Sequence, residues 1–472
     1  MTNRDSIRNT TWDELQIGAS ARIERLCTTD DLILFAHASG NLNPLMLPSG
    51  DEDDAIAPSL WVGSLVSAVL GNLLPGAGTL YLAQNFRFKE RVRPGERLIV
   101  EVRCTEKREK PIALFDVRVA KMDGVIACEG VAEVAAPNKS IVSRQEDLPA
   151  IILDHHDHFT GLIDRAAQLS PLRTAVVCPD DKNSLGGAIL AAERQLIEPL
   201  LIGSRARILD AAAESGLELD ERWIIDAANA YEACQRAVAL TQSGEARAIM
   251  KGNVHSDELL GAILKKDAGL RTGRRISHVF VMDAPTLDRL LFISDAAVNI
   301  APDLAVKVDI VQNAIDLAQA CGIETPKVGV LSAVEMVNIA IPSTLDAAIL
   351  SKMAERGQIR GGVVDGPLAM DNAVDIGAAR TKGITSFVAG RADILIAPNI
   401  EAGNMLAKEL TFVARAEAAG LVLGAKVPVM LTSRADNDRS RLASSALAAL
   451  FDHWRETGAA VPASQPLPRA AE

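Results

Sequence analysis

The stretch AIMKGNVHSDELLGAILKKDAGLRTGRRISHVFVMD, residues 248–283, contains the pattern that decides the fold of the larger part of the chain. Short, continuously apolar runs open and close it, at 248–250 and 278–282. Similar runs recur at 174–179, 199–203, 327–334, 361–366, 392–398 and 427–433, and helical stretches such as 185–198 and 343–356 separate many of them. Strands that are apolar on both faces and alternate with helices indicate a mostly parallel sheet covered on both sides.

The first part of the chain has a different pattern. Long runs at 80–92, 97–109, 113–124 and 125–136 alternate apolar with polar residues, as half-buried antiparallel strands do. The almost wholly apolar PSLWVGSLVSAVLGNLL (58–74) predicts a helix buried on several sides. A single helix wrapped by an antiparallel sheet is an α+β arrangement.

These patterns predict a multidomain chain. We assign 1–140 to the α+β domain, 141–164 to a polar, Pro-bounded linker, 165–456 to the α/β domain and 457–472 to a disordered Ala/Pro-rich tail. A length of 472 residues fits this division, since one hydrophobic core rarely organises so long a chain.

Composition excludes several classes of protein. A net charge of −12 and 3% aromatic residues oppose binding to nucleic acid or to an anionic membrane. No apolar run approaches the roughly 18 residues of a membrane span, and the N-terminus has no apolar signal segment. The six cysteines show no regular spacing, which is typical of reduced thiols and not of a zinc site or disulfide framework. We expect a cytoplasmic protein without a bound metal, and a buried, unreactive thiol at Cys178.

Function-capable residues follow the predicted strands of the second domain, in the segments 178–184, 251–257, 332–335, 365–372, 398–404 and 432–438. Ligands of open α/β sheets bind outside the carboxyl ends of the strands, so we expect all six loops at one edge of one sheet. The segment GLRTGRRISH (269–278) adds three arginines and two glycines, which suit a phosphate or a nucleotide tail.

The second domain resembles the phosphate acetyltransferase/phosphate butyryltransferase family, in the stretches 249–283, 293–314, 343–373, 392–410 and 426–438. The resemblance implies a two-lobed α/β phosphate acyltransferase fold with a cleft between the lobes, usually in a homodimer. It implies exchange of an acyl group between CoA and phosphate, with acyl-CoA, CoA, inorganic phosphate and acyl phosphate as ligands. CoA would be a substrate, and no cofactor would be permanently bound.

The resemblance also implies roles for particular residues. Ser433 would orient the CoA thiol, Arg434 would stabilise the phosphate and the developing oxyanion, and a carboxylate would act as the base. Asp436 is our choice for the base, with Asp438 as the alternative; both could instead cap the following helix. The residues that we assign to substrate binding are Lys251, Arg271, Thr272, Arg274, Ser277, His278, Asp365 and Asn404.

The first domain resembles the MaoC-like dehydratases, which have a hot-dog fold and include (R)-specific enoyl-CoA hydratases, in the stretches 35–47, 56–88 and 91–103. The hydratase loop of that group has an Asp and a His that activate water. This chain has SGNLNPLML at 39–47, with Asn41 and Met46 at those positions. Neither an amide nor a thioether transfers protons at working pH, so we predict a domain that no longer hydrates enoyl-CoA. His37 is a remaining candidate for acid–base function, and a turn without any ligand is the simplest alternative.

Three functions remain open from the sequence. The first is a phosphate acyltransferase whose first domain binds acyl-CoA or mediates assembly into a homo-oligomer. The second is a truly bifunctional enoyl-CoA hydratase and phosphate acyltransferase. The third is a relative of two-lobed dehydrogenases, which the absence of a nucleotide fingerprint disfavours.

Overall fold

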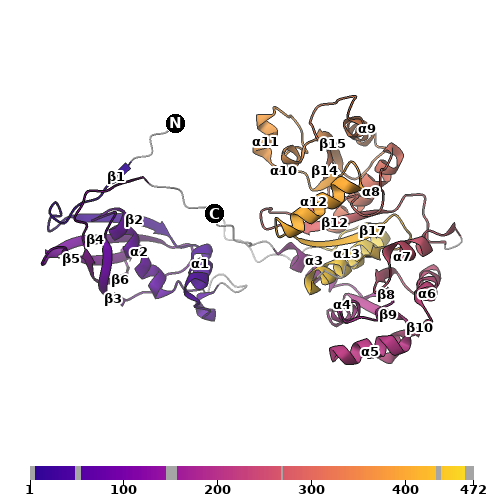
Figure 1. The fold of residues 1–472 in the computed structure, drawn as a ribbon, viewed down its shortest axis with the longest axis horizontal. Helices are drawn as coiled ribbons and strands as arrows, with labels where there is room; N and C mark the ends of the chain where they lie inside the picture. Colours follow the sequence, from indigo (N-terminus) through magenta and orange to yellow (C-terminus); the bar gives the residue numbers. More distant parts are fainter. Residues whose placement is uncertain (1–5, 48–54, 145–156, 267–268, 432–436, 463–472) are drawn as a thin grey trace. The chain divides into compact units, whose positions relative to one another are not determined.

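The structure is a computed structural model, and it describes residues 6–47, 55–144, 157–266, 269–431 and 437–462. The chain divides into two compact units, Met1–Leu153 and Asp154–Glu472 (Figure 1). The predicted tail, 457–472, lies mostly outside the described residues.

The first unit is a five-stranded antiparallel sheet in the order β2-β4-β5-β6-β3. Its helix α2 lies against the sheet, and Trp61, Val66, Val69 and Leu70 of α2 belong to the buried core of this unit. This is the hot-dog fold that the sequence predicts. The elements are β2 (Ser20–Leu26), α1 (Thr29–Ser39), the 3₁₀ turn η1 (Pro44–Met46), α2 (Ser59–Asn72), β3 (Leu80–Phe88), β4 (Arg97–Lys107), β5 (Ile112–Lys121) and β6 (Ile126–Ala135), with the short antiparallel pair β1 (Ser6–Arg8) and β7 (Val142–Arg144).

The alternating runs of the sequence are confirmed as strands because one face of each is buried. Along β4, Leu98, Val100, Val102 and Cys104 are buried, while the residues between them are at least partly exposed. The side chains of a strand point alternately to its two faces, so this pattern places one face of β4 on α2 and the other in solvent.

The second unit is an eleven-stranded mixed sheet in the order β10-β9-β8-β11-β18-β17-β12-β13-β16-β14-β15. The strands are β8 (Leu172–Val177), β9 (Ile197–Gly203), β10 (Ile224–Asp226), β11 (Ala248–Lys251), β12 (Ser277–Asp283), β13 (Leu291–Ser294), β14 (Lys327–Leu331), β15 (Val363–Leu368), β16 (Ile394–Ile396), β17 (Glu417–Leu423) and β18 (Val429–Met430). Strands β8 to β11 with β18 are parallel to one another, and so are β13 to β16. These two groups are the sheets of the two predicted lobes.

Helices cover both faces of this sheet. One core cluster combines α3 (His158–Ala166), α4 (Lys182–Glu193), α5 (Arg205–Ser215), α8 (Leu304–Ala320), α9 (Pro342–Glu355) and α13 (Asp438–Thr457). The other clusters contain α6 (Ala230–Gln242) and α7 (Ser256–Ile263) in the first lobe, and α10 (Met370–Val374), α11 (Ile376–Thr381) and α12 (Ile400–Phe412) in the second. Helix α13 packs against α3, α8 and β17 and so ties the two lobes together (Figure 1).

The two lobes are joined by strands that reverse the direction of the sheet. Strand β17 is antiparallel to both β18 and β12, and β12 is antiparallel to β13. Because three successive pairs are antiparallel, the strands of the second lobe run in the opposite direction to those of the first. The expectation that all six polar loops lie at one edge of the sheet is therefore wrong, since the loops of the two lobes leave the sheet at opposite edges.

Candidate active site

Three of the polar loops follow neighbouring strands of the first lobe. The register pairs Lys251 of β11 with Val177 of β8, and Met250 with Met430 of β18. Strands β8, β11 and β18 therefore end side by side at one edge of the sheet, and the segments 178–184 and 251–257 begin there, at the carboxyl ends of parallel strands, where ligands of α/β folds bind. Lys251 ends β11 and is partly buried at this edge.

The residues predicted to be catalytic, Ser433, Arg434 and Asp436, lie outside the described residues. The described chain stops at Leu431 and resumes at Asn437. Asn437 is the N-cap of α13, and its side-chain oxygen accepts a hydrogen bond of 2.8 Å from the backbone N–H of Ser440. Asp438 is the first residue of α13 and is exposed, where a carboxylate interacts favourably with the helix dipole. Asn437, and not Asp438, therefore fills the capping position.

The loop after β8 is held by polar contacts of Asp180 and Asp181. The carboxylate of Asp180 accepts a hydrogen bond of 2.9 Å from Nδ2 of Asn253 and forms an ion pair with Arg207. Asp181 is the N-cap of α4. Burial raises the pKa of its carboxyl group, but hydrogen bonds from Ser184 and from the helix backbone outweigh burial and hold this pKa below its usual value. The two loops after β8 and β11 are thus joined by one charged hydrogen bond, from Asn253 to Asp180.

Cys178 cannot serve this edge as a nucleophile in its described environment. Its side chain is buried, and burial raises the pKa of the thiol to about 12. A thiol with that pKa is protonated at neutral pH, and only the thiolate is a good nucleophile.

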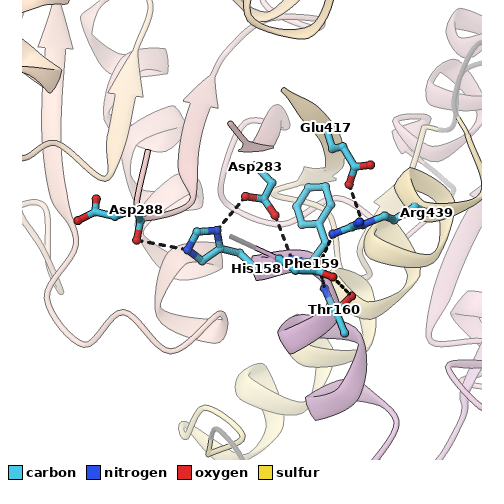
Figure 2. A network of polar contacts seen from close by, with 8 residues as sticks. His158, Phe159, Thr160, Asp283, Asp288, Glu417 and Arg439 are labelled. Atoms are coloured by element: carbon cyan, nitrogen blue, oxygen red, sulfur yellow. Dashed lines mark hydrogen bonds and ion pairs between the residues drawn. The ribbon is translucent and has the colours of Figure 1, made fainter. Parts of the chain in front are cut away.

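A network of charged contacts borders the same edge, where β12 ends and β17 begins (Figure 2). Asp283 at the end of β12 is buried and accepts hydrogen bonds from the ring of His158, at 2.8 Å, and from the backbone N–H of Phe159, at 3.3 Å. Arg439, in the first turn of α13, forms ion pairs with Glu417 at the start of β17 and with Asp157. The beginnings of α3 and α13 are therefore fixed together next to the segment 432–436.

The predicted phosphate-binding segment 269–278 lies at the opposite edge of the sheet, where β12 begins. Arg271 and Arg274, with Arg275, line a cavity of about 290 Å³ that also contains Asn299 and Gly424. The side-chain hydroxyl of Thr272 donates a hydrogen bond to the carbonyl of Gly424. These residues do not join Lys251 in one site, because the whole length of β12 separates the two edges.

Two of the predicted binding residues are inside the protein. Ser277 is fully buried and its hydroxyl accepts a hydrogen bond of 2.9 Å from Nδ2 of Asn313. His278 is 3% exposed, and burial lowers the pKa of its imidazole to about 4, although the nearby Asp295 opposes this. Strand β12 places both side chains in the core, and their contact with a substrate stays a prediction.

Asp295 is a structural residue that sequence reasoning missed. It follows β13 and accepts hydrogen bonds from the backbone N–H groups of His278, Ala297, Val298 and Asn299. The side-chain amide of Asn299 also donates to Asp295 and to the carbonyl of Ile276. A single Asp after an apolar run gives no sequence signal for this role. Three of its backbone partners are in the turn that follows it, and His278 belongs to β12.

The remaining predicted binding residues are separate from each other. Asn404 in α12 donates a hydrogen bond of 3.1 Å to the carbonyl of Ala296, so it supports the turn that Asp295 organises. Asp365 is on the edge strand β15 and lines a different cavity of about 420 Å³, together with Ser386 and Phe387. The geometry does not assign either residue to the first-lobe edge.

In the first unit, the side chains of Asn41 and Met46 are in contact. Helix α1 ends at Ser39, and Gly40 follows in the left-handed conformation. The side-chain amide of Asn41 donates to Sδ of Met46 at 3.4 Å, and its oxygen accepts from the backbone N–H of Asn43. His37 lies in the last turn of α1 and is exposed.

In the described ranges, no group of three or more His, Cys, Asp or Glu side chains could hold a metal ion. Within the same ranges, none of the helices is both long enough and apolar enough to cross a membrane.

Comparison with known proteins agrees with this two-part organisation. A family described as "Phosphate acetyl/butaryl transferase" matches residues 228–449. A phosphate acetyltransferase of Rhizobium meliloti is 58% identical over 293 residues, which cover 62% of this chain and 93% of the relative. A phosphate butyryltransferase of Clostridium beijerinckii is 43% identical over 293 residues, covering 62% of this chain and 97% of the relative.

Two solved structures resemble parts of this chain. A branched-chain phosphotransacylase from Enterococcus faecalis V583 superimposes with a TM-score of 0.52 and 29% identity, covering 60% of this chain and 99% of that one. The R-hydratase PhaJ1 from Pseudomonas aeruginosa is 32% identical over 32% of this chain and 99% of its own length, with a TM-score of 0.30.

The second unit, with its two lobes and its paired loops at the ends of parallel strands, is thus an acyltransferase. More narrowly, the chain belongs to the phosphate acetyl/butyryl transferase family, with a hot-dog domain at its N-terminal side.

Proposed function

We propose that this protein transfers a short acyl group, from acetyl to butyryl, between CoA and inorganic phosphate. The 58% identity to a phosphate acetyltransferase, over nearly the whole of that relative, is the observation that carries the proposal. This chemistry suits the proposed residues, because an acyl thioester is already activated and requires positioning and charge stabilisation more than a covalent nucleophile.

The proposed site lies at the carboxyl ends of β8, β11 and β18. A phosphate oxygen attacks the thioester carbonyl, the C–O bond forms, and collapse of the tetrahedral intermediate breaks the C–S bond and releases CoA thiolate. Arg434 would stabilise the oxyanion and the phosphate, and Ser433 would orient the sulfur. In the reverse direction Asp436 would take the thiol proton. Lys251 is placed by the register at the neighbouring strand end and would add positive charge there.

This proposal keeps only Lys251 from the predicted substrate-binding set. Ser277 and His278 are buried, and Arg271, Thr272 and Arg274 are at the other edge of the sheet. Asp365 lines a separate cavity, and Asn404 donates a hydrogen bond to the carbonyl of Ala296.

We also propose that the first unit does not hydrate enoyl-CoA and instead binds acyl-CoA or contributes to assembly. The side chains of Asn41 and Met46 support this proposal, because neither an amide nor a thioether transfers protons.

We further propose a homo-oligomer in the cytoplasm. Large apolar side chains that are strongly exposed on the second unit, among them Ile339, Phe387 and Phe412, support association with another copy. Light scattering of the purified protein measures the mass directly.

The test of the transfer reaction is CoA release and acyl phosphate formation from acetyl-, propionyl- and butyryl-CoA with phosphate. We expect turnover in the wild type. Arg434→Gln should lower kcat by about 10²- to 10³-fold, as for removal of an oxyanion donor. Asp436→Asn should lower it by about 10²- to 10⁴-fold, since it removes a general base.

Asp438→Asn is the matched control, because Asp438 is exposed in the first turn of α13. It should stay near the wild-type rate. A large loss of activity in Asp438→Asn, together with an active Asp436→Asn, would assign the role of base to Asp438. No acyl phosphate from any of the three substrates would reject the proposed reaction.

A further inference from the structure

The cavity at the start of β12 is a second positively charged site. Arg271, Arg274 and Arg275 come from one short segment and all line the same cavity of about 290 Å³. The three arginines give this cavity a positively charged lining in a chain with a net charge of −12. Like charges near one another repel, and a bound anion offsets this repulsion.

The backbone of the segment that carries the arginines is held by hydrogen bonds and by close packing. The carbonyl of Arg275 accepts a hydrogen bond of 3.1 Å from Nδ2 of the buried Asn313, and its N–H donates to Asp309 at 2.9 Å. Gly424 has a φ of +92°, and a Cβ at this position would overlap the carbonyl oxygen of Arg275. The backbone of the arginine segment is thus held by α8 on one side and by the end of β17 on the other.

Carboxylates neutralise this cluster only in part. Arg274 forms an ion pair with Asp316 of α8, and Asp309 accepts from the backbone of Arg275. In the part of the chain that the structure describes, no carboxylate forms an ion pair with the side chain of Arg271 or Arg275. The side chains of Arg271 and Arg275 therefore remain for a ligand in the cavity.

The position of the cavity separates it from the proposed catalytic edge. Helix α7 starts in the loop after Lys251, and Leu264, which directly follows α7, lines the cavity. An eight-residue helix is about 12 Å long, and the seven residues of β12 between Ser277 and Asp283 span about 20 Å. An anion in this cavity is therefore at the opposite edge of the sheet from the proposed catalytic edge.

We propose that this arginine pocket, lined by Arg271, Arg274 and Arg275, binds a small phosphorylated anion that is not the reacting phosphate. Guanidinium groups bind phosphoryl oxygens through paired N–H donors, which fits this lining. The cavity volume is at the lower limit of ligand pockets, which usually have roughly 300 to 1,000 Å³, so the ligand is compact. The proposal relies on the proposed function only in placing the catalytic residues at the other edge.

Inorganic diphosphate is the probe, and its binding to the full-length protein is measured by isothermal titration calorimetry. Arg275→Gln is the informative variant, because its backbone contacts with Asp309, Asn313 and Gly424 do not involve the side chain. Arg391→Gln removes the same charge from an exposed position of the second lobe and is the control. Arg434→Gln removes the proposed catalytic cation.

We expect diphosphate to bind the wild type, Arg391→Gln and Arg434→Gln with similar affinity, and Arg275→Gln at least tenfold more weakly. The KM for CoA should be the same in Arg275→Gln and in the wild type. Absence of binding to the wild type would overturn the proposal, and so would loss of binding in Arg434→Gln with normal binding in Arg275→Gln. A raised KM for CoA in Arg275→Gln would also overturn it, by assigning the pocket to the nucleotide tail of CoA. Because titration needs no turnover, its result can be read even if the transferase reaction fails.

Discussion

The side-chain amide of Asn41 donates a hydrogen bond to the thioether sulfur of Met46 at 3.4 Å. These are the two positions where the hydratases that the first unit resembles carry their Asp and His. The two side chains are thus in contact, and neither an amide nor a thioether transfers protons at working pH.

We predict that the wild-type protein does not measurably hydrate crotonyl-CoA, and that the double variant Asn41→Asp, Met46→His gains this activity. General acid–base catalysis contributes about 10²- to 10⁴-fold to a rate, so a gain of about 100-fold over the wild type is the expected minimum. The loss of absorbance of the enoyl thioester measures it, and each single variant is a control. Hydration by the wild type that His37→Ala abolishes would contradict this prediction.

The fold was predictable where burial leaves a pattern in a single segment. Residues Val100, Val102 and Cys104 alternate with polar residues because one face of β4 is buried, and the apolar run 278–282 is continuous because both faces of β12 are covered. The reversal of the sheet was not predictable in this way. It depends on the pairing of β12 with β17, which are far apart in the sequence, and an apolar strand has the same pattern in either direction.

A segment's place in the chain also decides its edge. The segment 251–257 follows β11, whereas 269–278 precedes β12, which runs in the same direction as β11, so the two segments lie at different edges. His278 and Arg275 are in one short segment, but one side chain is in the core and the other lines a cavity. Which of them faces solvent depends on where β12 begins.

We predict that Asp283→Ala destabilises the second unit by about 1.5 to 3 kcal/mol. Its buried carboxylate binds the ring of His158 and the N–H of Phe159, and hydrogen bonds to charged groups contribute about that much (Figure 2). Asp288→Ala is the control, because the side chain of Asp288 is 80% exposed and should change stability by no more than about 0.5 kcal/mol. Urea unfolding followed by circular dichroism measures both, and equal effects would contradict the structural role of Asp283.

Gly424→Ala should destabilise the second unit by about 1 to 3 kcal/mol more than Gly216→Ala. Both glycines have positive φ, at +92° and +65°, so alanine is strained at each. At Gly216, the C-cap of α5, nothing lies within 4 Å of the added Cβ, whereas at Gly424 it meets the carbonyl of Arg275. Thermal unfolding of the two variants gives the comparison. Equal stability would show that the arginine segment can shift away from β17 at no cost.

Finally, His278 should make the second unit sensitive to acid. Burial lowers the pKa of its imidazole from 6.5 to about 4 in the folded protein, so between these values the unfolded chain takes up a proton that the folded chain does not. Stability from this group is therefore complete above pH 6.5 and is lost as the pH falls toward 4, by at most about 1.4 kcal/mol per pH unit.

His278→Gln should remove this part of the pH dependence, although the substitution itself lowers stability at neutral pH. His255→Gln, at an exposed position of the same unit, is the control. Differential scanning calorimetry between pH 7 and 4.5 gives the melting temperature of each protein. The wild type and His255→Gln should lose stability more steeply than His278→Gln as the pH falls. Parallel curves for all three would show that His278 takes up its proton equally in the folded and unfolded states.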